Sequence, residues 1–197
     1  MRIRDSCLGN SQPLVFNTEK ALRAGYAQMK KEGESEVSGS QFWKLLVPHK
    51  HKLYNFIQKS MNFSEDANDI FQETVMRAFR YFNSYKKEKE FSTWIFTIAH
   101  NEVKKYFRKS RKYVFVTNID RIKSSEQENS YELIQEVYRF AERLKPKQRQ
   151  VFFLFYYNGF TISEVSQITR IKEGTIKFIL NRARNDLKEI LGEHNDK

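Results

Sequence analysis

Residues 64–112 read SEDANDIFQETVMRAFRYFNSYKKEKEFSTWIFTIAHNEVKKYFRKSRK, and this stretch decides the fold. Apolar side chains recur at three- and four-residue spacing on both sides of a short basic loop, which predicts two amphipathic helices. The first helix would bury Ala67, Ile70, Phe71, Thr74, Val75, Ala78 and Phe82. The second helix would bury Phe91, Trp94, Ile95, Ile98, Val103 and Tyr106. Ser64 is placed to cap the first helix, and Ser92 or Thr93 the second.

The two predicted helices carry opposite charges. Polar side chains gather near the start of the first helix, on the side away from its apolar face: Asp66, Asp69, Gln72 and Glu73. The second helix ends in a basic run, because six of the nine residues 104–112 are Lys or Arg. One element therefore offers carboxylates and the next offers cations and aromatic rings, which favours an adaptor between a protein and a nucleic acid.

The composition points to the same class of partner. The chain has 197 residues, a formal net charge of +11 and a single cysteine, Cys7. A balance this basic favours a polyanionic partner, while one cysteine excludes an internal disulfide and a cysteine-rich zinc site. The longest apolar run, residues 151–157, is far shorter than a membrane span, and residues 1–10 do not read as a signal peptide. We therefore expect a cytoplasmic protein with no direct membrane insertion.

The sequence before this stretch predicts one more helix. Residues 1–40 are expected to be a flexible extension, of which residues 32–40 have the composition of a polar linker. Residues 41–61 are amphipathic, and Pro48 should kink or split that helix near its middle. His49 and His51 are expected to be surface residues, because no Cys, Asp or Glu nearby completes a metal site.

After a predicted linker at residues 113–130, helical periodicity resumes and ends in a helix-turn-helix pattern. Asn158 and Gly159 should stop one helix, and Thr161 with Glu164 forms a capping box that opens the next. A turn at residues 169–171 leads to a last helix at residues 172–191. Five side chains face away from its apolar stripe, where they could read base edges in the major groove: Lys177, Phe178, Asn181, Arg182 and Asn185.

The basic side of the second helix gives a weaker signal. Its polar residues, Thr97, Asn101, Lys104, Lys105 and Arg108, could follow a phosphate backbone, or they could form an ordinary solvated face. The loop before it holds Tyr85, Lys86 and Lys87, which could grip an unstacked base.

Two stretches of the sequence resemble a known protein family. Residues 66–111, from DANDIFQETV to YFRKSR, resemble region two of bacterial sigma factors of the extracytoplasmic-function type, and residues 144–191 resemble their region four. The resemblance implies an all-α fold of two small helical domains, at residues 41–112 and 131–192, with a flexible linker between them and a tail at 193–197. It also implies three partners: core RNA polymerase, promoter DNA and an anti-sigma factor. Neither catalysis nor a metal or other cofactor is implied.

The resemblance extends to single positions. Asp66, Asp69, Gln72 and Glu73 match an acidic motif that docks on the polymerase clamp helices. Residues 85–87 fall in a loop that captures a flipped base of the downstream promoter element, and Asn101 and Arg108 match the helix beside that element. The helix that reads the upstream element is matched at its entry and again further along by Gly174, Thr175, Ile176, Lys177, Arg182 and Arg184. The chain departs from the family pattern at Asn68, His100, Lys105, Phe178 and Ile179.

Two other interpretations stay open from the residues alone. A stand-alone helix-turn-helix regulator would bind duplex DNA without polymerase, as a dimer on two half-sites. A metal-dependent nucleic-acid-processing enzyme would have to use His49, His51 or His100, and no carboxylate cluster or nucleophile–base pair stands at a workable spacing from them.

Overall fold

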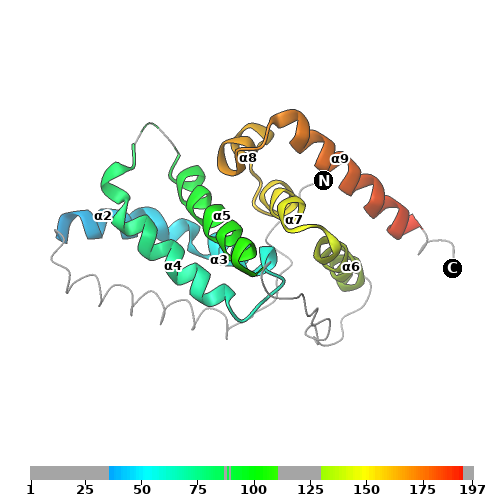
Figure 1. Cartoon of the computed structure of the whole chain (residues 1–197), viewed down its shortest axis with the longest axis horizontal. Helices are drawn as coiled ribbons and strands as arrows, with labels where there is room; N and C mark the ends of the chain where they lie inside the picture. Colours follow the sequence, from blue (N-terminus) through cyan, green and yellow to red (C-terminus); the bar gives the residue numbers. More distant parts are fainter. Residues whose placement is uncertain (1–35, 87, 89, 111–129, 193–197) are drawn as a thin grey trace.

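The computed structural model describes residues 36–86, 88, 90–110 and 130–192, and over these residues the protein is all-α, as predicted (Figure 1). The first domain consists of α2 (Glu36–Leu46), η2 (Val47–His49), α3 (Lys50–Ser60), α4 (Ala67–Arg80), η3 (Phe82–Ser84) and α5 (Phe91–Ser110). The second consists of α6 (Ser130–Arg143), α7 (Pro146–Phe152), η4 (Phe153–Tyr157), α8 (Ile162–Thr169) and α9 (Glu173–Gly192). The predictions for residues 1–35, Lys87, residues 113–129 and the tail lie outside the described residues.

The first domain is built around the ring of Phe42. Phe42 is fully buried, and its ring centroid lies 5.3 Å from that of Phe79 and 5.4 Å from that of Phe82. Pro48 splits the predicted helix as expected, since a short 3₁₀ turn separates α2 from α3. The linker prediction is wrong for residues 36–40, which are helical. Composition missed this start because Gly39, which looks like a linker residue, packs close to the Phe79 ring.

The predicted caps of α4 and α5 are both wrong. The N-cap of α4 is Asp66, and no side chain caps it. Ser64 lies in the turn before the helix, where its Oγ accepts a hydrogen bond from the Asp66 N–H at 3.3 Å. The predicted cap at Ser92 or Thr93 is wrong, since α5 already begins at Phe91. The first helical hydrogen bond runs from the Trp94 N–H to the Glu90 carbonyl, at 3.2 Å, so both candidate caps lie inside the helix.

The second domain contains the predicted helix-turn-helix. The Thr161 N–H donates to Glu164 Oε2 at 2.7 Å, and the Glu164 N–H donates to Thr161 Oγ1 at 3.2 Å, so the capping box at the start of α8 is confirmed. Gly159 ends the preceding helix with φ of +78°, a conformation that glycine adopts without a steric penalty. Arg170 makes the turn between α8 and α9 in the left-handed region.

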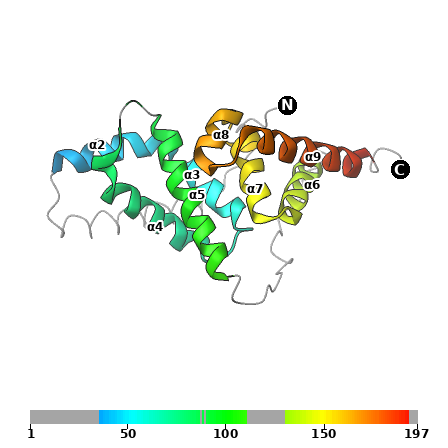
Figure 2. The same ribbon diagram turned by 45° about the horizontal axis from the view of Figure 1, so that its top comes forward.

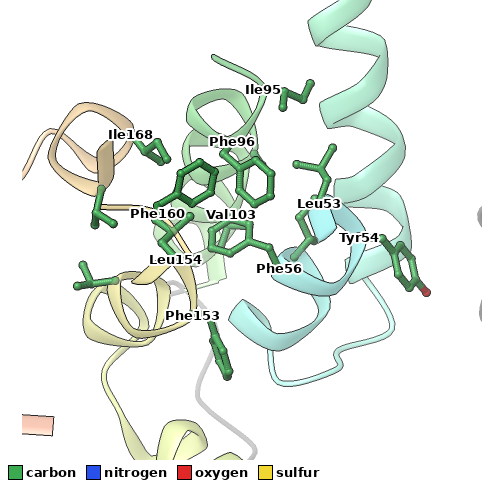
Figure 3. Close-up of a cluster of buried hydrophobic side chains, with 14 of the residues drawn as sticks. Leu53, Tyr54, Phe56, Ile95, Phe96, Val103, Phe153, Leu154, Phe160 and Ile168 are labelled. Carbon is green, nitrogen blue, oxygen red and sulfur yellow. The ribbon is translucent and has the colours of Figure 1, made fainter. Parts of the chain in front are cut away.

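The two domains pack against each other through α5, which lies between α3 and α4 on one side and α7 and α8 on the other (Figures 1 and 2). The Phe96 ring lies 5.4 Å from that of Phe56 in its own domain and 4.9 Å from that of Phe160 in the other. Leu154 and Ile168 complete this shared core and are fully buried (Figure 3). Helix α5 therefore buries two faces, whereas the apolar periodicity of its sequence predicted only one.

Buried polar groups also make contacts across the interface between the two domains. The guanidinium of Arg149 donates to four backbone carbonyls, one of which belongs to the end of α3 in the first domain. The ammonium of Lys59 on α3 lies over the rings of Tyr138 and Tyr157, at 4.7 and 4.2 Å from their centroids. His100 Nδ1 lies 2.7 Å from Gln150 Oε1. These contacts place the two domains in one compact arrangement.

None of the described helices is long and apolar enough to cross a membrane.

Candidate functional site

The predicted acidic face lies along the solvent side of α4. Asp66, Asp69 and Gln72 are exposed and Glu73 is half-buried, while Phe71 and its apolar neighbours face the core. Two of the acids already have partners within the protein. Asp66 Oδ2 accepts a hydrogen bond from the Tyr106 hydroxyl at 2.8 Å, and Glu73 forms an ion pair with Arg77 at 3.7 Å. Asp66, Asp69 and Gln72 therefore form the exposed part of this face, and Asp66 is held in place by Tyr106.

Asn68 does not extend the acidic face. Its Oδ1 accepts hydrogen bonds from the Tyr54 hydroxyl at 2.9 Å and from Gln58 Nε2 at 3.1 Å, which ties α4 to α3. Burial raises the pKa of Tyr54, while its hydrogen bond with Gln58 works in the opposite direction. The protonated tyrosine is the form that can donate to Asn68. An amide at this position therefore serves the packing of the first domain.

A buried carboxylate links α4 to α5, and sequence reasoning did not find it. Glu102 is 3% exposed; its Oε1 lies 3.0 Å from Arg77 Nε and its Oε2 lies 3.5 Å from Lys105 Nζ. A buried carboxylate is stable only when it is paired in this way. Lys105, which was predicted to contact DNA, is thus half-buried and held by an acid from its own helix. Glu102 lies on the predicted apolar face of α5, four residues after Ile98 and four before Tyr106, so the sequence signal was a charged residue at a buried position.

The other predicted residues of the basic side of α5 are available to solvent. Asn101, Lys104 and Arg108 are exposed. Thr97 is half-buried, and its hydroxyl donates to the Thr93 carbonyl at 2.7 Å. This side of α5 thus presents two cations and one amide, a set that suits a phosphate backbone.

Tyr85, in the loop between η3 and α5, belongs to an aromatic cluster. Its ring stacks on that of Phe82 at 6.0 Å and lies 5.5 Å from that of Phe91 and 5.2 Å from that of Trp94. Burial, followed by the charge of Glu90, raises the pKa of Tyr85. Lys86 is exposed, and Lys87 lies outside the described residues. The ring of Tyr85 is therefore already packed against other rings of the protein, whereas the neighbouring Lys86 is open to solvent.

The predicted DNA-reading residues of α9 all lie on its solvent side. The helix buries Ile176, Ile179, Leu180 and Ala183. The exposed side chains on the other side are Thr175, Lys177, Phe178, Asn181, Arg182 and Arg184. Spacings of four and three residues align Lys177 with Asn181 and Arg184, and Phe178 with Arg182. Phe178 is 65% exposed, which is unusual for a large apolar side chain at a helix surface.

Three of the histidines, His49, His51 and His100, lie in the described part of the chain. Within the described ranges, no group of three or more His, Cys, Asp and Glu side chains is arranged to hold a metal ion. His51 is exposed, as predicted. His49 was expected at the surface but is half-buried, with its ring 6.0 Å from that of Phe91, and burial lowers its pKa. The split of the helix at Pro48 turns His49 towards the start of α5, which the sequence pattern could not indicate.

Comparisons with known proteins agree with this arrangement. The family described as Sigma-70 region 2 matches residues 45–113, and Sigma-70, region 4 matches residues 134–187. The chain is 30% identical to the ECF RNA polymerase sigma factor SigM of Bacillus subtilis over 144 residues, which cover 70% of this chain and 87% of that protein. It is 27% identical to BldN, an ECF RNA polymerase sigma factor of Streptomyces coelicolor, over 81% of this chain. That match spans 62% of BldN, less than two thirds of its length.

Solved structures show the same fold. The sigma factor RpoE of Bartonella quintana, crystallised with the anti-sigma factor NepR, matches with a TM-score of 0.66 and 26% identity. The match covers 77% of this chain and 97% of that one. CnrH, solved in complex with the cytosolic domain of CnrY, matches with a TM-score of 0.59 and 18% identity over 90% of this chain and 97% of that one, which shows a common fold.

Proposed function

The chain belongs to the extracytoplasmic-function (ECF) family of RNA polymerase sigma factors, and from this premise we propose that it recruits core RNA polymerase to promoters through three separate surfaces. The acidic face of α4 binds polymerase, α9 reads the upstream promoter element as duplex, and α5 with the loop before it binds the downstream element as melted strand. The single observation that carries the proposal is that exposed acidic residues on α4 and exposed basic residues on α5 and α9 lie on separate helices of one chain.

The polymerase-binding role rests on the charge and exposure of α4. Asp69 and Gln72 lie at its solvent surface, and Asp66 and Glu73 flank them. Complementary charges across an interface speed association and set its register. A basic helical surface on polymerase is the partner that these carboxylates fit. The chain as a whole is strongly basic, with a net charge of +11, so an acidic patch here is a local exception to the overall charge.

The upstream-element role rests on α9. A helix that follows a tight turn after α8 can enter the major groove with its first turns. Lys177 and Arg182 donate to guanine, Asn181 suits adenine, and the apolar ring of Phe178 suits the methyl group of thymine. Thr175 and Arg184 are also exposed and flank these residues at opposite edges of the solvent-facing surface, where they can contact sugar and phosphate. The exposed Phe178 predicts that the upstream element contains a thymine at the base step it faces.

The downstream-element role rests on α5. Asn101, Lys104 and Arg108 are exposed along one side of the helix, and Lys105 is held beside them by Glu102. These residues can track a single-strand backbone, while Lys86 and Lys87 add cations to the loop. We also infer an anti-sigma partner, since the Bartonella relative was crystallised with one. Such a partner would keep the chain from polymerase until it is released.

A transcription experiment tests the proposal. Core polymerase with wild-type protein should select promoter fragments from a random duplex library and transcribe them, whereas core polymerase alone should not. Lys177→Ala with Arg182→Ala should lower the affinity for the selected duplex and the salt dependence of binding, because two contacts to DNA are lost. Lys188→Ala, an exposed lysine further along α9, is the matched control and should change neither. If the chain binds the duplex equally well without polymerase, the stand-alone regulator is the better explanation.

A further inference from the structure

Tyr81 is an exposed aromatic residue close to the loop before α5, and neither the sequence pattern nor the family resemblance gives it a role. Four large hydrophobic side chains are exposed among the described residues, namely Val47, Phe63, Tyr81 and Phe178. Tyr81 follows directly after α4, and η3 then leads from it into the loop before α5 (Figure 1). Its side chain is 57% exposed, whereas its neighbours Phe79 and Phe82 are each 8% exposed.

The backbone of Tyr81 is held firmly. Its N–H donates to the Arg77 carbonyl at 3.1 Å, and its own carbonyl accepts from the Ser84 N–H at 3.0 Å and from the Ser84 hydroxyl at 2.6 Å. The residues on either side are anchored in the core, since the rings of Phe79 and Phe82 both contact Phe42. The exposed ring of Tyr81 therefore projects from a rigid base, so little conformational freedom is lost when a ligand binds to it.

Two exposed cations lie close to Tyr81 in the sequence. They are Arg80, directly before it, and Lys86, at the start of the loop, and the exposed acids Glu88 and Glu90 follow further along. Proteins bind single-stranded nucleic acid by combining an exposed aromatic ring with nearby cations, because every base has a face that can stack. Tyr85 fits this role less well than its position in the sequence indicated, since three aromatic rings of the protein already surround it.

We propose that Tyr81 is the residue of the first domain on which an unstacked base of the melted promoter strand stacks, and that Tyr85 instead supports the loop from within the aromatic cluster. This inference rests on the proposed sigma-factor function. Tyr81 is thereby added to the proposed DNA-binding residues, although neither the apolar periodicity nor the family motif had indicated it. The ligand is a base of single-stranded DNA, with Arg80 and Lys86 placed to contact the adjoining phosphates.

The test uses polymerase holoenzyme and a promoter fragment that the wild-type holoenzyme has selected from a random library. One probe is fully paired, and the other carries mismatches across the downstream element so that its strands stay open. Dissociation constants for both probes, measured by fluorescence anisotropy, are compared for wild type, Tyr81→Ala and Tyr81→Phe. Phe63→Ala is the matched control, because Phe63 is also an exposed aromatic residue but lies before the opposite end of α4.

We expect Tyr81→Ala to weaken binding of the open probe by between about 5-fold and 150-fold, the range for loss of one base-stacking contact. Tyr81→Phe keeps the ring and should stay within about two-fold of wild type, as should Phe63→Ala. The affinity for core polymerase should not change in any variant. Circular dichroism should report the same helix content throughout, because the side chain of Tyr81 is exposed.

Two results would overturn the inference while leaving the proposed function intact. In one, Tyr81→Ala binds the open probe as wild type does. In the other, Tyr81→Ala binds core polymerase more weakly, which would make Tyr81 a polymerase contact. If the wild-type holoenzyme itself does not prefer the open probe, the proposed function fails and this inference fails with it.

Discussion

His100 should make the stability of this protein depend on pH between neutrality and pH 4. Burial lowers the pKa of His100 from 6.5 to about 4, the nearby charges of Lys104 and Lys147 lower it further, and the hydrogen bond with Gln150 opposes the shift. Gln150 Nε2 donates to the Pro146 carbonyl at 3.3 Å, which turns its oxygen towards His100. Nδ1 of the neutral imidazole therefore donates to Gln150 Oε1.

The sign and size of the effect follow from this shift. As the pH falls below 6.5, the unfolded chain binds a proton at His100 that the folded protein does not bind until about pH 4. Folding is therefore opposed increasingly over that window, and stability is lost on acidification. Between pH 7 and pH 5 the loss from this one group is about 2 kcal/mol. That is a large part of the 5–15 kcal/mol typical of a folded domain.

Urea unfolding at pH 7 and pH 5 measures this loss. His100→Gln keeps a donor towards Gln150 but cannot titrate, so its loss between the two pH values should be about 2 kcal/mol smaller than that of wild type. His51→Gln removes an exposed histidine instead and should lose as much stability as wild type does. Equal losses in wild type and His100→Gln would show that His100 is not held neutral at the domain interface.

Three further changes have defined outcomes. Arg149→Met should lower the free energy of unfolding by about 3 to 5 kcal/mol in urea titrations, because it removes four hydrogen bonds from a charged group to backbone carbonyls, and Arg149→Lys should recover only part of this since an ammonium lacks the planar fork. Thr161→Ala should cost about 1 kcal/mol through the lost capping box, while the exposed Ser163→Ala changes little. Phe178→Ala should weaken binding of the selected duplex about four-fold, and replacing the facing thymine by uracil should remove the difference between the two proteins.

The fold was predictable from the sequence wherever one face of a helix is buried. The stripe of α4 and the capping box before α8 are local signals, and both are confirmed. The second apolar face of α5 was not predicted, although Phe96 and Ala99 lie off the predicted stripe and are buried. Apolar residues around most of a helix indicate that it is covered on more than one side. Applied to α5, that rule predicts contact with a second set of helices.

The polar contacts of the interface could not be predicted in this way. Arg149 and Lys59 belong to residue types that are usually exposed, and both are buried here. The contacts described above join them to backbone carbonyls and to the faces of tyrosine rings, and neither kind of partner produces a recognisable sequence pattern. The residues predicted to contact DNA are exposed on α9 and, except for the half-buried Thr97 and Lys105, on α5. Which aromatic ring of the loop is exposed depends on packing around Phe42 and Phe82.

The most direct test of the account is the affinity of this protein for core RNA polymerase when the acidic face of α4 is altered. Asp69→Lys is the cleanest change, because Asp69 is exposed and its reversal leaves the Asp66–Tyr106 hydrogen bond and the Glu73–Arg77 ion pair in place. Glu189→Lys, at the far end of α9, is the control for net charge. We expect tight binding by wild type and by Glu189→Lys, and binding about ten-fold weaker by Asp69→Lys. Equal affinity for all three proteins would contradict the docking face, and no binding by wild type would contradict the sigma-factor function itself.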